Sequence, residues 1–418
     1  MTSPPAASLT ELGRQTRRAA RDVARASSAQ RDDALLHTAD LLEASVGRIL
    51  EANATDLAGA EAAGATDTSL DRLRLDRGRI AAMAAGLRKV AGLSDPVGEV
   101  VDGWVRPNGL RVRRVRVPLG VVGIIYENRP NVTSDAAGLC LKSGNGALLR
   151  GSSAALGSNR AIVESVHRGL DKAGLPEDAV GLVEETSRES AVAFMQLGEA
   201  IDCLIPRGGP SLIATIREHA TVPYVIDGDG NCHVYVDAAA DLAMAESIVV
   251  NAKTQRPGVC NSAESLLVHR SVASAFLPRV AGSLVGVELV GDEATRAILP
   301  SVAPATEEDY ATEFLGLRLS VAVVDDLDSA IGHIARFGSG HSEAIVTGDL
   351  AAAARFTTEV DAAAVVVNAS TRFIDGEELG LGAEIGISTQ KLHARGPMGL
   401  RELTCVKYIV EGEGQVRG

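Results

Sequence analysis

Residues 120–126 read Gly-Val-Val-Gly-Ile-Ile-Tyr, an uninterrupted apolar stretch that runs directly into the polar segment 127–129. A strand with one face in water alternates apolar and polar side chains, whereas a continuous apolar run is typical of a strand covered by helices on both faces. The stretch therefore predicts a buried strand of a parallel sheet, and with it an α/β fold.

Helix and strand patterns alternate on the C-terminal side of this stretch. A helical segment from Ser134 to Ser143 ends at Gly144-Asn145-Gly146 and leads into a second apolar strand at 147–149. This alternation is that of a doubly wound sheet, in which ligands bind at the carboxyl ends of the strands. Further strands of this sheet are predicted at 181–183, 203–205, 224–226 and 234–236.

A second α/β unit is predicted to begin near Asp241. No linker rich in proline, glycine or serine separates it from the first unit, so the two should share an extensive interface, where small-molecule sites often lie. Its strands are predicted at 265–268, 287–290, 319–324, 344–347 and 364–367.

The N-terminal side reads as helices followed by a hairpin. Apolar residues recur at helical spacing from Leu35 to Ile49, after a candidate cap at Ser28. Asn108-Gly109 suits a tight turn with positive φ at both turn positions, and it joins two strands of which the second is rich in arginine. Such a strand fits an exposed ribbon or a subunit contact.

The 418 residues have a globular composition, with 46% hydrophobic and 23% charged residues and a formal net charge of -13. This acidic balance disfavours nucleic acid as a partner. The five cysteines are odd in number and show no C-x-x-C pattern, which favours a reducing, cytoplasmic compartment over a disulfide framework or a zinc site. No apolar run approaches the ~18 residues of a membrane span, and the arginine-rich start is predicted to be a folded helix rather than a targeting segment.

Cys260 follows a Pro-Gly turn and has Lys253 and Arg256 close in sequence. Cations lower the pKa of a thiol and favour the nucleophilic thiolate. The alternative is an ordinary structural cysteine, which is the commoner case when these residues are considered alone. His233 and His341 lie closest to loops rich in glycine or serine, but spacing assigns neither of them a role.

Two strand ends could hold an anion, with plain turns as the alternative in both places. Residues 206–210, Pro-Arg-Gly-Gly-Pro, place free backbone N–H groups and a helix dipole at a strand-to-helix turn. After the first strand, Asn128 could donate its amide to an oxyanion, and Arg129 could meet a carboxylate or phosphate bidentately. A Gly-x-Gly-x-x-Gly loop is not found, because Gly380–Gly386 has the wrong spacing and follows no strand.

Taken together, these motifs resemble the aldehyde dehydrogenase superfamily and, within it, the gamma-glutamyl phosphate reductase family. Residues 117–131, Val-Pro-Leu-Gly-Val-Val-Gly-Ile-Ile-Tyr-Glu-Asn-Arg-Pro-Asn, are similar to the superfamily's strand followed by Asn-x-Pro. The resemblance spans nearly the whole chain in the family's order. The stretches similar to the reductases are Ile205-Pro-Arg-Gly-Gly209, Lys253-Thr-Gln-Arg-Pro-Gly-Val-Cys260-Asn261, Gly340-His-Ser-Glu-Ala-Ile-Val346, Val367-Asn-Ala-Ser-Thr-Arg372, Gly382-Ala-Glu-Ile-Gly-Ile-Ser-Thr389 and Leu392-His-Ala-Arg-Gly-Pro-Met-Gly-Leu400.

The resemblance implies an aldehyde dehydrogenase-like α/β fold with three parts. A doubly wound NADP-binding domain would comprise residues 1–97 and 118–238, with a return segment at about 370–395. A second, catalytic α/β domain would comprise residues 239–369. Residues 98–117 and 396–413 would form a small β element for homo-oligomerisation.

The resemblance also implies roles for single residues. Cys260 is expected to be the catalytic nucleophile and Asn128 the oxyanion donor. Arg150 stands where the superfamily has a lysine at the adenosine ribose, and Ser153 where NAD-preferring members often have a glutamate, so NADPH is the expected cofactor. No metal is expected. The remaining cofactor-binding candidates are Ser152, Gly208, Gly209 and Glu313.

The implied reaction is the NADPH-dependent reduction of L-glutamyl 5-phosphate to L-glutamate 5-semialdehyde and phosphate, through a thioester on Cys260, in proline biosynthesis. Residues 226–230, Ile-Asp-Gly-Asp-Gly, lack the glutamate with which hydrolytic aldehyde dehydrogenases activate water, which would protect that thioester. As a hypothesis, Arg129 and Arg256 hold the phosphate and the substrate carboxylate. A transient contact with glutamate 5-kinase is left open.

Three rival functions stay open. A CoA-acylating aldehyde dehydrogenase would share the fold and the thioester, although the stretch 253–261 speaks against it. A Cys-His amide hydrolase would use Cys260 with His233 or His341 and need no nicotinamide. A catalytically silent scaffold is disfavoured because Cys260 and Asn128 are both present.

Overall fold

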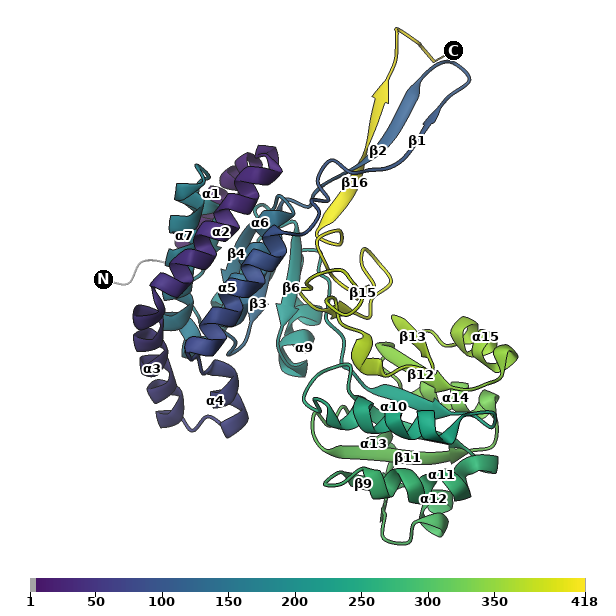
Figure 1. Ribbon diagram of the computed structural model, residues 1–418. Helices are drawn as coiled ribbons and strands as arrows, with labels where there is room; N and C mark the ends of the chain where they lie inside the picture. Colours follow the sequence, from purple (N-terminus) through teal and green to yellow (C-terminus); the bar gives the residue numbers. More distant parts are fainter. Residues whose placement is uncertain (1–4, 418) are drawn as a thin grey trace. The chain divides into compact units, whose positions relative to one another are not determined.

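The computed structural model describes residues 5–417, apart from the side chains of residues 5–8 and 210. The chain forms two compact units, and each has its own sheet and helices (Figure 1). The first unit consists of the described residues up to Ile226, together with Leu381–Gly386 and the segment from Met398 onward. The second consists of Asp227–Gly380 and Ile387–Pro397.

The first unit is built on a parallel sheet in the order β5-β4-β3-β6. All six residues of β3 are buried, as the apolar run predicts. Chain order runs from β3 outward to β5 and then reverses to β6 on the other side of β3. The loops after β3 and β6 therefore meet at a switch point, the place where open α/β sheets bind ligands. The strands are β3 (Val121–Tyr126), β4 (Gly146–Arg150), β5 (Val180–Leu182) and β6 (Cys203–Arg207).

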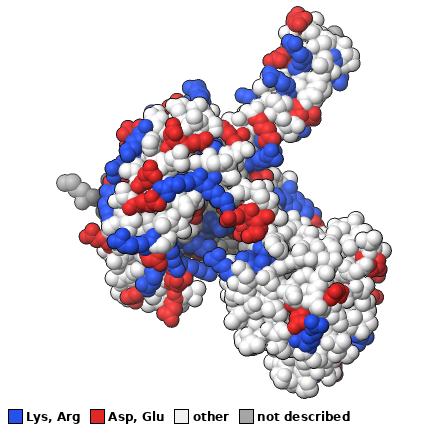
Figure 2. All heavy atoms as spheres, in the orientation of Figure 1, with Lys and Arg blue, Asp and Glu red and all other residues white. Residues whose placement is uncertain are grey.

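The predicted hairpin joins the C-terminal strand in an antiparallel sheet of the order β1-β2-β16, which projects as an arm from the first unit (Figure 1). Only Gly109 of the turn has positive φ, 89°, because the strands are joined by a longer loop than the two-residue turn that was predicted. Acidic and basic side chains mix along the arm (Figure 2), and Arg113 pairs with Glu411 at 2.8 Å. The strands are β1 (Val100–Val105), β2 (Arg111–Pro118) and β16 (Thr404–Glu411).

Helices cover the first sheet, and α2 packs against α5 and α7. The cap of α2 is Ser27, one residue before the predicted cap. The Ser27 side chain accepts the Gln30 N–H and the Gln30 side chain accepts the Ser27 N–H, so the two satisfy each other at the helix start. The helices are α1 (Pro5–Arg25), α2 (Ser28–Ala44), α3 (Val46–Ala62), α4 (Asp67–Leu73), α5 (Arg77–Ala91), α6 (Asn131–Lys142), α7 (Leu156–Lys172), α8 (Arg188–Met195) and α9 (Pro210–His219), with short 3-10 helices η1 (Ser153–Ala155) and η2 (Glu177–Ala179).

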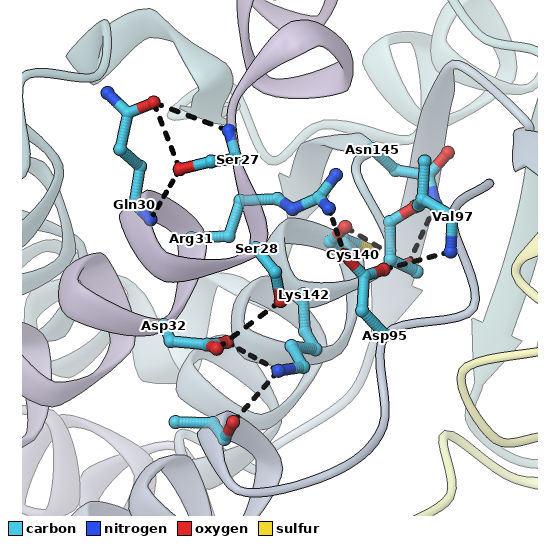
Figure 3. Close-up of polar contacts among 12 residues, drawn as sticks. Ser27, Ser28, Gln30, Arg31, Asp32, Asp95, Val97, Cys140, Lys142 and Asn145 are labelled. Atoms are coloured by element: carbon cyan, nitrogen blue, oxygen red, sulfur yellow. Dashed lines mark hydrogen bonds and ion pairs between the residues drawn. The ribbon is translucent and has the colours of Figure 1, made fainter.

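Two buried cations fix α2 in the first unit (Figure 3). Lys142 of α6 is buried, pairs with Asp32 and donates to the carbonyl oxygen of Ala91 at 2.8 Å. Arg31 is likewise buried and pairs with Asp95. A buried charge without a partner would be strongly destabilising, so these pairs hold α2 against α6 and against the segment that follows α5.

The second unit is built on a seven-stranded parallel sheet in the order β10-β9-β11-β8-β7-β12-β13. Val234 and Val236 of β7 pack on the face covered by α10 and α11, whereas Tyr235 packs on the opposite face, stacked on Phe356 of α15. The strands are β7 (Cys232–Val236), β8 (Ala263–His269), β9 (Glu288–Gly291), β10 (Ala303–Pro304), β11 (Arg318–Val324), β12 (Ser342–Val346) and β13 (Ala364–Val367), and β14 (Ile387–Ser388) pairs separately with β15 (Gly396–Pro397). The helices are α10 (Leu242–Thr254), α11 (Arg270–Ser283), α12 (Glu293–Ile298), α13 (Glu307–Ala311), α14 (Leu327–Phe337), α15 (Leu350–Glu359) and the 3-10 helix η3 (Thr371–Phe373).

Two predictions about the sheets are wrong. Residues 234–236 were expected in the first sheet, but β7 lies in the second, between β8 and β12. A short apolar pattern predicts a buried strand without indicating which of two parallel sheets receives it. The strand expected at 224–226 is reduced to a single bridge between Leu204 and Tyr224.

The limits of the units also differ from the predicted domain boundaries. The first unit ends at Ile226, whereas the predicted NADP-binding domain continues to residue 238. Of the predicted return segment at 370–395, only Leu381–Gly386 belongs to the first unit. The functions of the domains stay predictions. Among the described residues, no helix is long and apolar enough to cross a membrane.

Candidate active site

Cys260 lies in the loop that connects α10 to β8 of the second unit. Asp241 caps the start of α10 through the N–H groups of Ala243 and Met244, and the helix ends at Thr254, shortly before the Pro-Gly turn. The chain then turns into β8, an inner strand of the sheet. Cys260 is half-buried and lies on a loop whose two ends are fixed in regular structure.

The backbone of Cys260 is held from the side of β7. The Cys232 thiol donates to the carbonyl oxygen of Cys260 at 3.1 Å. Burial raises the pKa of Cys232 well above its ordinary value, so this thiol keeps its proton and stays a donor. Gly230 packs directly on the same carbonyl group, because a Cβ atom placed on Gly230 would lie 1.7 Å from that oxygen. His341 lies behind Cys232, with its Nδ1 3.7 Å from the Cys232 sulfur.

The residue after Cys260 is held from a different part of the chain. The Thr371 hydroxyl donates to the carbonyl oxygen of Asn261 at 2.7 Å, and the Asn261 side-chain amide donates to the carbonyl oxygen of Ile374 at 2.8 Å. Both contacts come from η3 and the residue that follows it. The loop of Cys260 is therefore fixed on both sides by hydrogen bonds between residues far apart in sequence.

The cations near Cys260 differ from those predicted. Lys253 was expected to activate the thiol, but it is fully buried and its Nζ donates to Glu264 at 2.5 Å. Burial lowers the pKa of Lys253 and raises that of Glu264 to about 7, which shows how strongly this pair is desolvated. Arg256 is exposed, as a ligand-binding cation can be. Arg372 of η3, which was not among the predicted site residues, also lies here: burial and then the charge of Arg256 lower its pKa, whereas Asp375 and Cys260 raise it.

Glu313 lies in the same region. Its Oε1 accepts the N–H of Gly230 at 2.9 Å, and burial raises its pKa. Two residues later, Leu315 has φ of 52°, and its N–H donates to Glu264 at 3.3 Å. The predicted cofactor ligand Glu313 thus lies beside the glycine that packs on Cys260.

Asn128 lies in the first unit, directly after β3, with φ of 42°. Its Nδ2 donates to the Ser69 hydroxyl at 2.8 Å, and its Oδ1 accepts the Ser152 hydroxyl at 2.7 Å. Ser152, predicted to bind the cofactor, therefore orients the Asn128 amide here. Ser69 of α4 was not predicted, because nothing in the local sequence links it to residue 128. Arg129 follows, half-buried, before Pro130 opens α6.

Arg150 ends β4 and is largely buried. Its Nη2 donates to the carbonyl oxygen of Ser187 at 2.7 Å, and burial lowers its pKa. Its Nε is buried and has no hydrogen-bond partner among the residues that the structure describes. A buried cation with an unused N–H group is suited to an anionic ligand. Ser153 is exposed at the start of η1, three residues further on.

Gly208 and Gly209 follow β6, on the other side of the switch point. Gly209 caps α9, and its N–H donates to the Glu127 carboxylate at 3.1 Å. A Cβ on Gly208 would lie 2.8 Å from the same carboxylate. An acidic side chain therefore lies at the helix N-terminus, where the backbone N–H groups and the dipole favour negative charge. The N–H groups and the helix dipole that stabilise the Glu127 carboxylate would stabilise the oxygens of a bound phosphate at the same position.

The predicted site residues thus form two groups, and each lies within one unit. The first unit holds the candidate anion and cofactor ligands at the carboxyl ends of its strands. The second holds Cys260, Arg256 and Glu313. Among the described residues, no cluster of histidine, cysteine, aspartate and glutamate is arranged to bind a metal.

Comparison with known proteins gives the family context. The model of the aldehyde dehydrogenase family matches residues 5–309. The chain is 56% identical over 409 residues to the gamma-glutamyl phosphate reductase of Carboxydothermus hydrogenoformans, covering 97% of this chain and 99% of the relative. The crystal structure of the Thermotoga maritima gamma-glutamyl phosphate reductase superposes with a TM-score of 0.95 at 49% identity, covering 98% and 99% of the two chains. An acetylating aldehyde dehydrogenase from Geobacillus thermoglucosidasius shares the fold, with a TM-score of 0.71 at 15% identity over 99% and 98% of the chains.

Proposed function

Because the chain belongs to the aldehyde dehydrogenase family and to its gamma-glutamyl phosphate reductases, we propose that it reduces L-glutamyl 5-phosphate to L-glutamate 5-semialdehyde and phosphate with NADPH, as a step of proline biosynthesis. Membership makes the protein an oxidoreductase and implies a nicotinamide cofactor. The observation that carries the proposal is the loop of Cys260: this half-buried cysteine has its backbone held by Cys232 and Gly230, and the next residue is held by Thr371. Such fixation is what a nucleophile needs in order to meet its substrate in one geometry.

In the proposed reaction, the Cys260 thiolate attacks the acyl carbon of the substrate. The tetrahedral adduct collapses by breaking the bond to the phosphate oxygen, so phosphate leaves and an acyl thioester remains. When bound, the reduced nicotinamide supplies the hydride that reduces the thioester carbonyl to a thiohemiacetal on Cys260, from which the aldehyde is released. Breaking the carbon–sulfur bond then returns the electron pair to Cys260 as thiolate.

We assign the side-chain donor for the oxyanion to Asn128, together with the backbone N–H of Cys260. Ser152 fixes the Asn128 amide by donating to its Oδ1, which leaves Nδ2 as the group that would turn to the oxyanion. Nδ2 now donates to Ser69, so the substrate would replace a hydroxyl partner. Replacing one neutral acceptor by a charged one is favourable.

Protection of the thioester from water follows from residues 227–230. Asp227 accepts the N–H of Ile387 at 2.8 Å, so this carboxylate fixes β14. Gly228 packs on Thr389, and Gly230 packs on Cys260. No glutamate stands in this stretch to activate a water molecule, which suits an enzyme whose thioester must wait for hydride.

The candidate cofactor residues fit a phosphorylated dinucleotide. Arg150, with its unused buried N–H group, would bind the 2′-phosphate of NADPH, and the exposed Ser153 presents no acid that would repel it. Gly208 and Gly209 offer backbone N–H groups at the start of α9, where Glu127 would yield to a phosphate. Glu313 is assigned to the nicotinamide ribose.

The substrate and partner assignments complete the proposal. Arg129 and Arg256 would hold the phosphate and the substrate carboxylate, and replacing either with lysine should raise KM because lysine lacks the bidentate fork. The arm of β1, β2 and β16 exposes Val105, Tyr408 and other apolar side chains, which supports homo-oligomerisation. A cytoplasmic location and a transient contact with glutamate 5-kinase belong to the same proposal.

The test is the reverse reaction, in which glutamate 5-semialdehyde reduces NADP. We expect activity that requires phosphate and disappears in Cys260→Ala, with Cys405→Ala as a control on an exposed cysteine. Activity with CoA in place of phosphate would indicate an acylating dehydrogenase, and activity without either would indicate a hydrolytic one. An enzyme that binds no NADP and hydrolyses amides would replace the proposal with a Cys-His hydrolase.

A further inference from the structure

Arg372 is built into the same segment that fixes the loop of Cys260. It lies in η3 between Thr371 and Ile374. Thr371 binds the backbone carbonyl of Asn261, the residue after Cys260, and Ile374 binds the Asn261 side-chain amide. The backbone on both sides of Arg372 is therefore tied to the neighbour of the nucleophile. This placement depends on two hydrogen bonds of 2.7 and 2.8 Å and leaves little freedom for the position of the Arg372 Cα atom.

The guanidinium of Arg372 is also oriented. Its Nε donates to the Gln255 side-chain oxygen at 2.9 Å. Gln255 immediately precedes Arg256, so one contact ties Arg372 to the segment that carries the second arginine. Because Nε is used, the terminal amino groups are the part of the guanidinium that remains to meet a ligand.

Two cations, Arg372 and Arg256, lie together at this position, and Asp375 is the acid whose charge acts on Arg372. Arg372 is half-buried, and its pKa is lowered first by that burial and then by the charge of Arg256, while Asp375 and, after it, Cys260 act in the opposite direction. Among the residues that the structure describes, Arg372 forms no ion pair with a carboxylate, whereas Arg318, Arg355 and Arg395 each have one. Because Asp375 forms no ion pair with Arg372 among the described residues, an anion that binds to both arginines would stabilise this half-buried pair.

We infer that Arg372 and Arg256 form an oxyanion-binding subsite beside Cys260, with Gln255 as the residue that positions Arg372, and that this subsite takes the phosphate of the acyl phosphate and the inorganic phosphate that leaves. The inference rests on the proposed function. It adds Arg372 as a specificity-determining residue, and of the two proposed substrate arginines, Arg129 and Arg256, it assigns Arg256 to the phosphate.

The chemistry of the substrate favours phosphate over carboxylate at this place. The phosphate is bonded through oxygen to the carbon that the thiolate attacks, whereas the α-carboxylate lies at the opposite end of the carbon chain. A group bound next to the nucleophile must therefore be the leaving group. Guanidinium groups that bind its oxygens also stabilise the charge that builds up as the carbon–oxygen bond breaks.

The direct test measures how fast iodoacetamide alkylates Cys260, by mass spectrometry of its peptide, in the full chain without nucleotide. Inorganic phosphate should slow alkylation in the wild type. In Arg372→Gln the phosphate concentration for half-protection should rise by about tenfold or more, since at least one charge-assisted hydrogen bond is lost. Arg372→Lys should recover part of the effect and Gln255→Ala should show an intermediate loss. Arg296→Gln, an exposed arginine of the same unit, should behave as the wild type.

Turnover distinguishes the possible sources of the bound anion. In the semialdehyde-oxidising direction, Arg372→Gln should raise the KM for phosphate by about tenfold while the KM for the semialdehyde changes less than about twofold. If L-glutamate protects Cys260 and phosphate does not, or if the KM for the semialdehyde rises instead, the subsite binds a carboxylate and the inference is overturned. Wild-type enzyme with no phosphate-dependent turnover would refute the proposed function, whereas turnover with unchanged phosphate protection in Arg372→Gln would refute the subsite alone.

Discussion

The Cys232 thiol donates a hydrogen bond of 3.1 Å to the carbonyl oxygen of Cys260. A buried cysteine of β7 therefore holds the backbone of the cysteine in the loop before β8. The two residues differ in role although both are cysteines. Cys232 is fully buried and stays protonated, because burial raises its pKa well above the ordinary value. Cys260 is half-buried and lies in the loop before β8.

Removing this donor should misplace Cys260, the proposed nucleophile, without abolishing the fold. A neutral hydrogen bond of this kind contributes about 0.5–1.5 kcal/mol, so Cys232→Ala should lower kcat by about two- to tenfold. KM should change little. The second-order rate of Cys260 alkylation should fall in parallel, and Cys232→Ser, which keeps a donor, should restore both rates. Equal rates in Cys232→Ala and the wild type would show that the contact does not position Cys260.

Gly230 provides a sterically sharper test of the same fixation. A Cβ atom at this position would lie 1.7 Å from the Cys260 carbonyl oxygen, so Gly230→Ala must displace the loop. A displacement of about 1 Å at a reacting group can cost about 100-fold in rate, which is the expected loss of kcat. Gly332→Ala is the matched control, because a Cβ there meets open space on α14 and should stabilise the helix by about 0.5–1 kcal/mol. Wild-type kcat in Gly230→Ala would contradict the packing described here.

Much of this arrangement follows from local sequence. The aliphatic runs at β3, β8 and β11 are long enough to predict buried strands, and the Pro-Gly turn before Cys260 marks a loop with a candidate nucleophile. What local patterns do not contain is the partner of each residue. Gln255 and Arg372 are 117 residues apart and meet only when η3 packs beside the loop of Cys260.

The role predicted for Lys253 differs from the structure for the same reason, because local sequence does not show which residue it contacts. Its position near Cys260 in sequence indicated an activating cation, but α10 turns its side chain into the core, where Glu264 neutralises it. The direction of the Lys253 side chain depends on which face of α10 it occupies and on the packing of β8 against that face. Neither follows from the number of residues between Lys253 and Cys260. Likewise, the contact from Ser69 to Asn128 joins α4 to the loop after β3 across 59 positions.

His341 gives the protein a predictable acid sensitivity. Burial lowers its pKa to about 4 from the ordinary 6.5, so the folded protein holds it neutral. Between these values the unfolded state binds the extra proton, and stability from this group is complete above pH 6.5 and is lost as the pH falls toward 4. The expected loss is about 1.4 kcal/mol per pH unit in that interval.

Urea unfolding of the wild type and of His341→Gln at several pH values between 5 and 7.5 measures this contribution as a difference, which removes the contributions of other groups. The free energy of unfolding should decline less steeply toward acid in the variant, by about 2 kcal/mol over the interval. His37→Gln, a half-exposed histidine of α2, serves as the control. Parallel curves for the wild type and His341→Gln would show that His341 takes up its proton equally in the folded and unfolded states, and that burial does not lower its pKa.

Asn128 has a backbone conformation that favours asparagine or glycine and a proposed role as oxyanion donor, and two substitutions separate the two. Its φ of 42° lies in the left-handed region, which asparagine and glycine accept more readily than alanine. Both variants lose the amide's hydrogen bonds to Ser69 and Ser152, so Asn128→Ala should be less stable than Asn128→Gly by about 1 kcal/mol because of the φ alone. Both variants lack the amide and should lose about 100-fold or more in kcat. An active Asn128→Gly would remove Asn128 from the oxyanion site, whatever the stability of the alanine variant.

Cofactor choice should depend on Arg150 and Ser153. A carboxylate at residue 153 would repel a 2′-phosphate and accept the free 2′-hydroxyl, so Ser153→Glu should weaken NADPH binding by about tenfold or more and leave or improve NADH binding. Because Ser153 is exposed, this change should not disturb folding. Arg150→Gln should also weaken NADPH binding selectively, although its lost contact to Ser187 adds a structural effect.

Fluorescence titration of each variant with NADPH and NADH reports binding without turnover. Arg160→Gln is the matched control, because Arg160 is an exposed arginine of α7 that pairs with Glu184 at 2.8 Å. The ratio of the two dissociation constants should move toward NADH in Ser153→Glu and Arg150→Gln and stay at the wild-type value in Arg160→Gln. If the wild type binds both nucleotides equally and Ser153→Glu leaves the ratio unchanged, the 2′-phosphate is not recognised at the end of β4, and the buried Nε of Arg150 needs a different ligand.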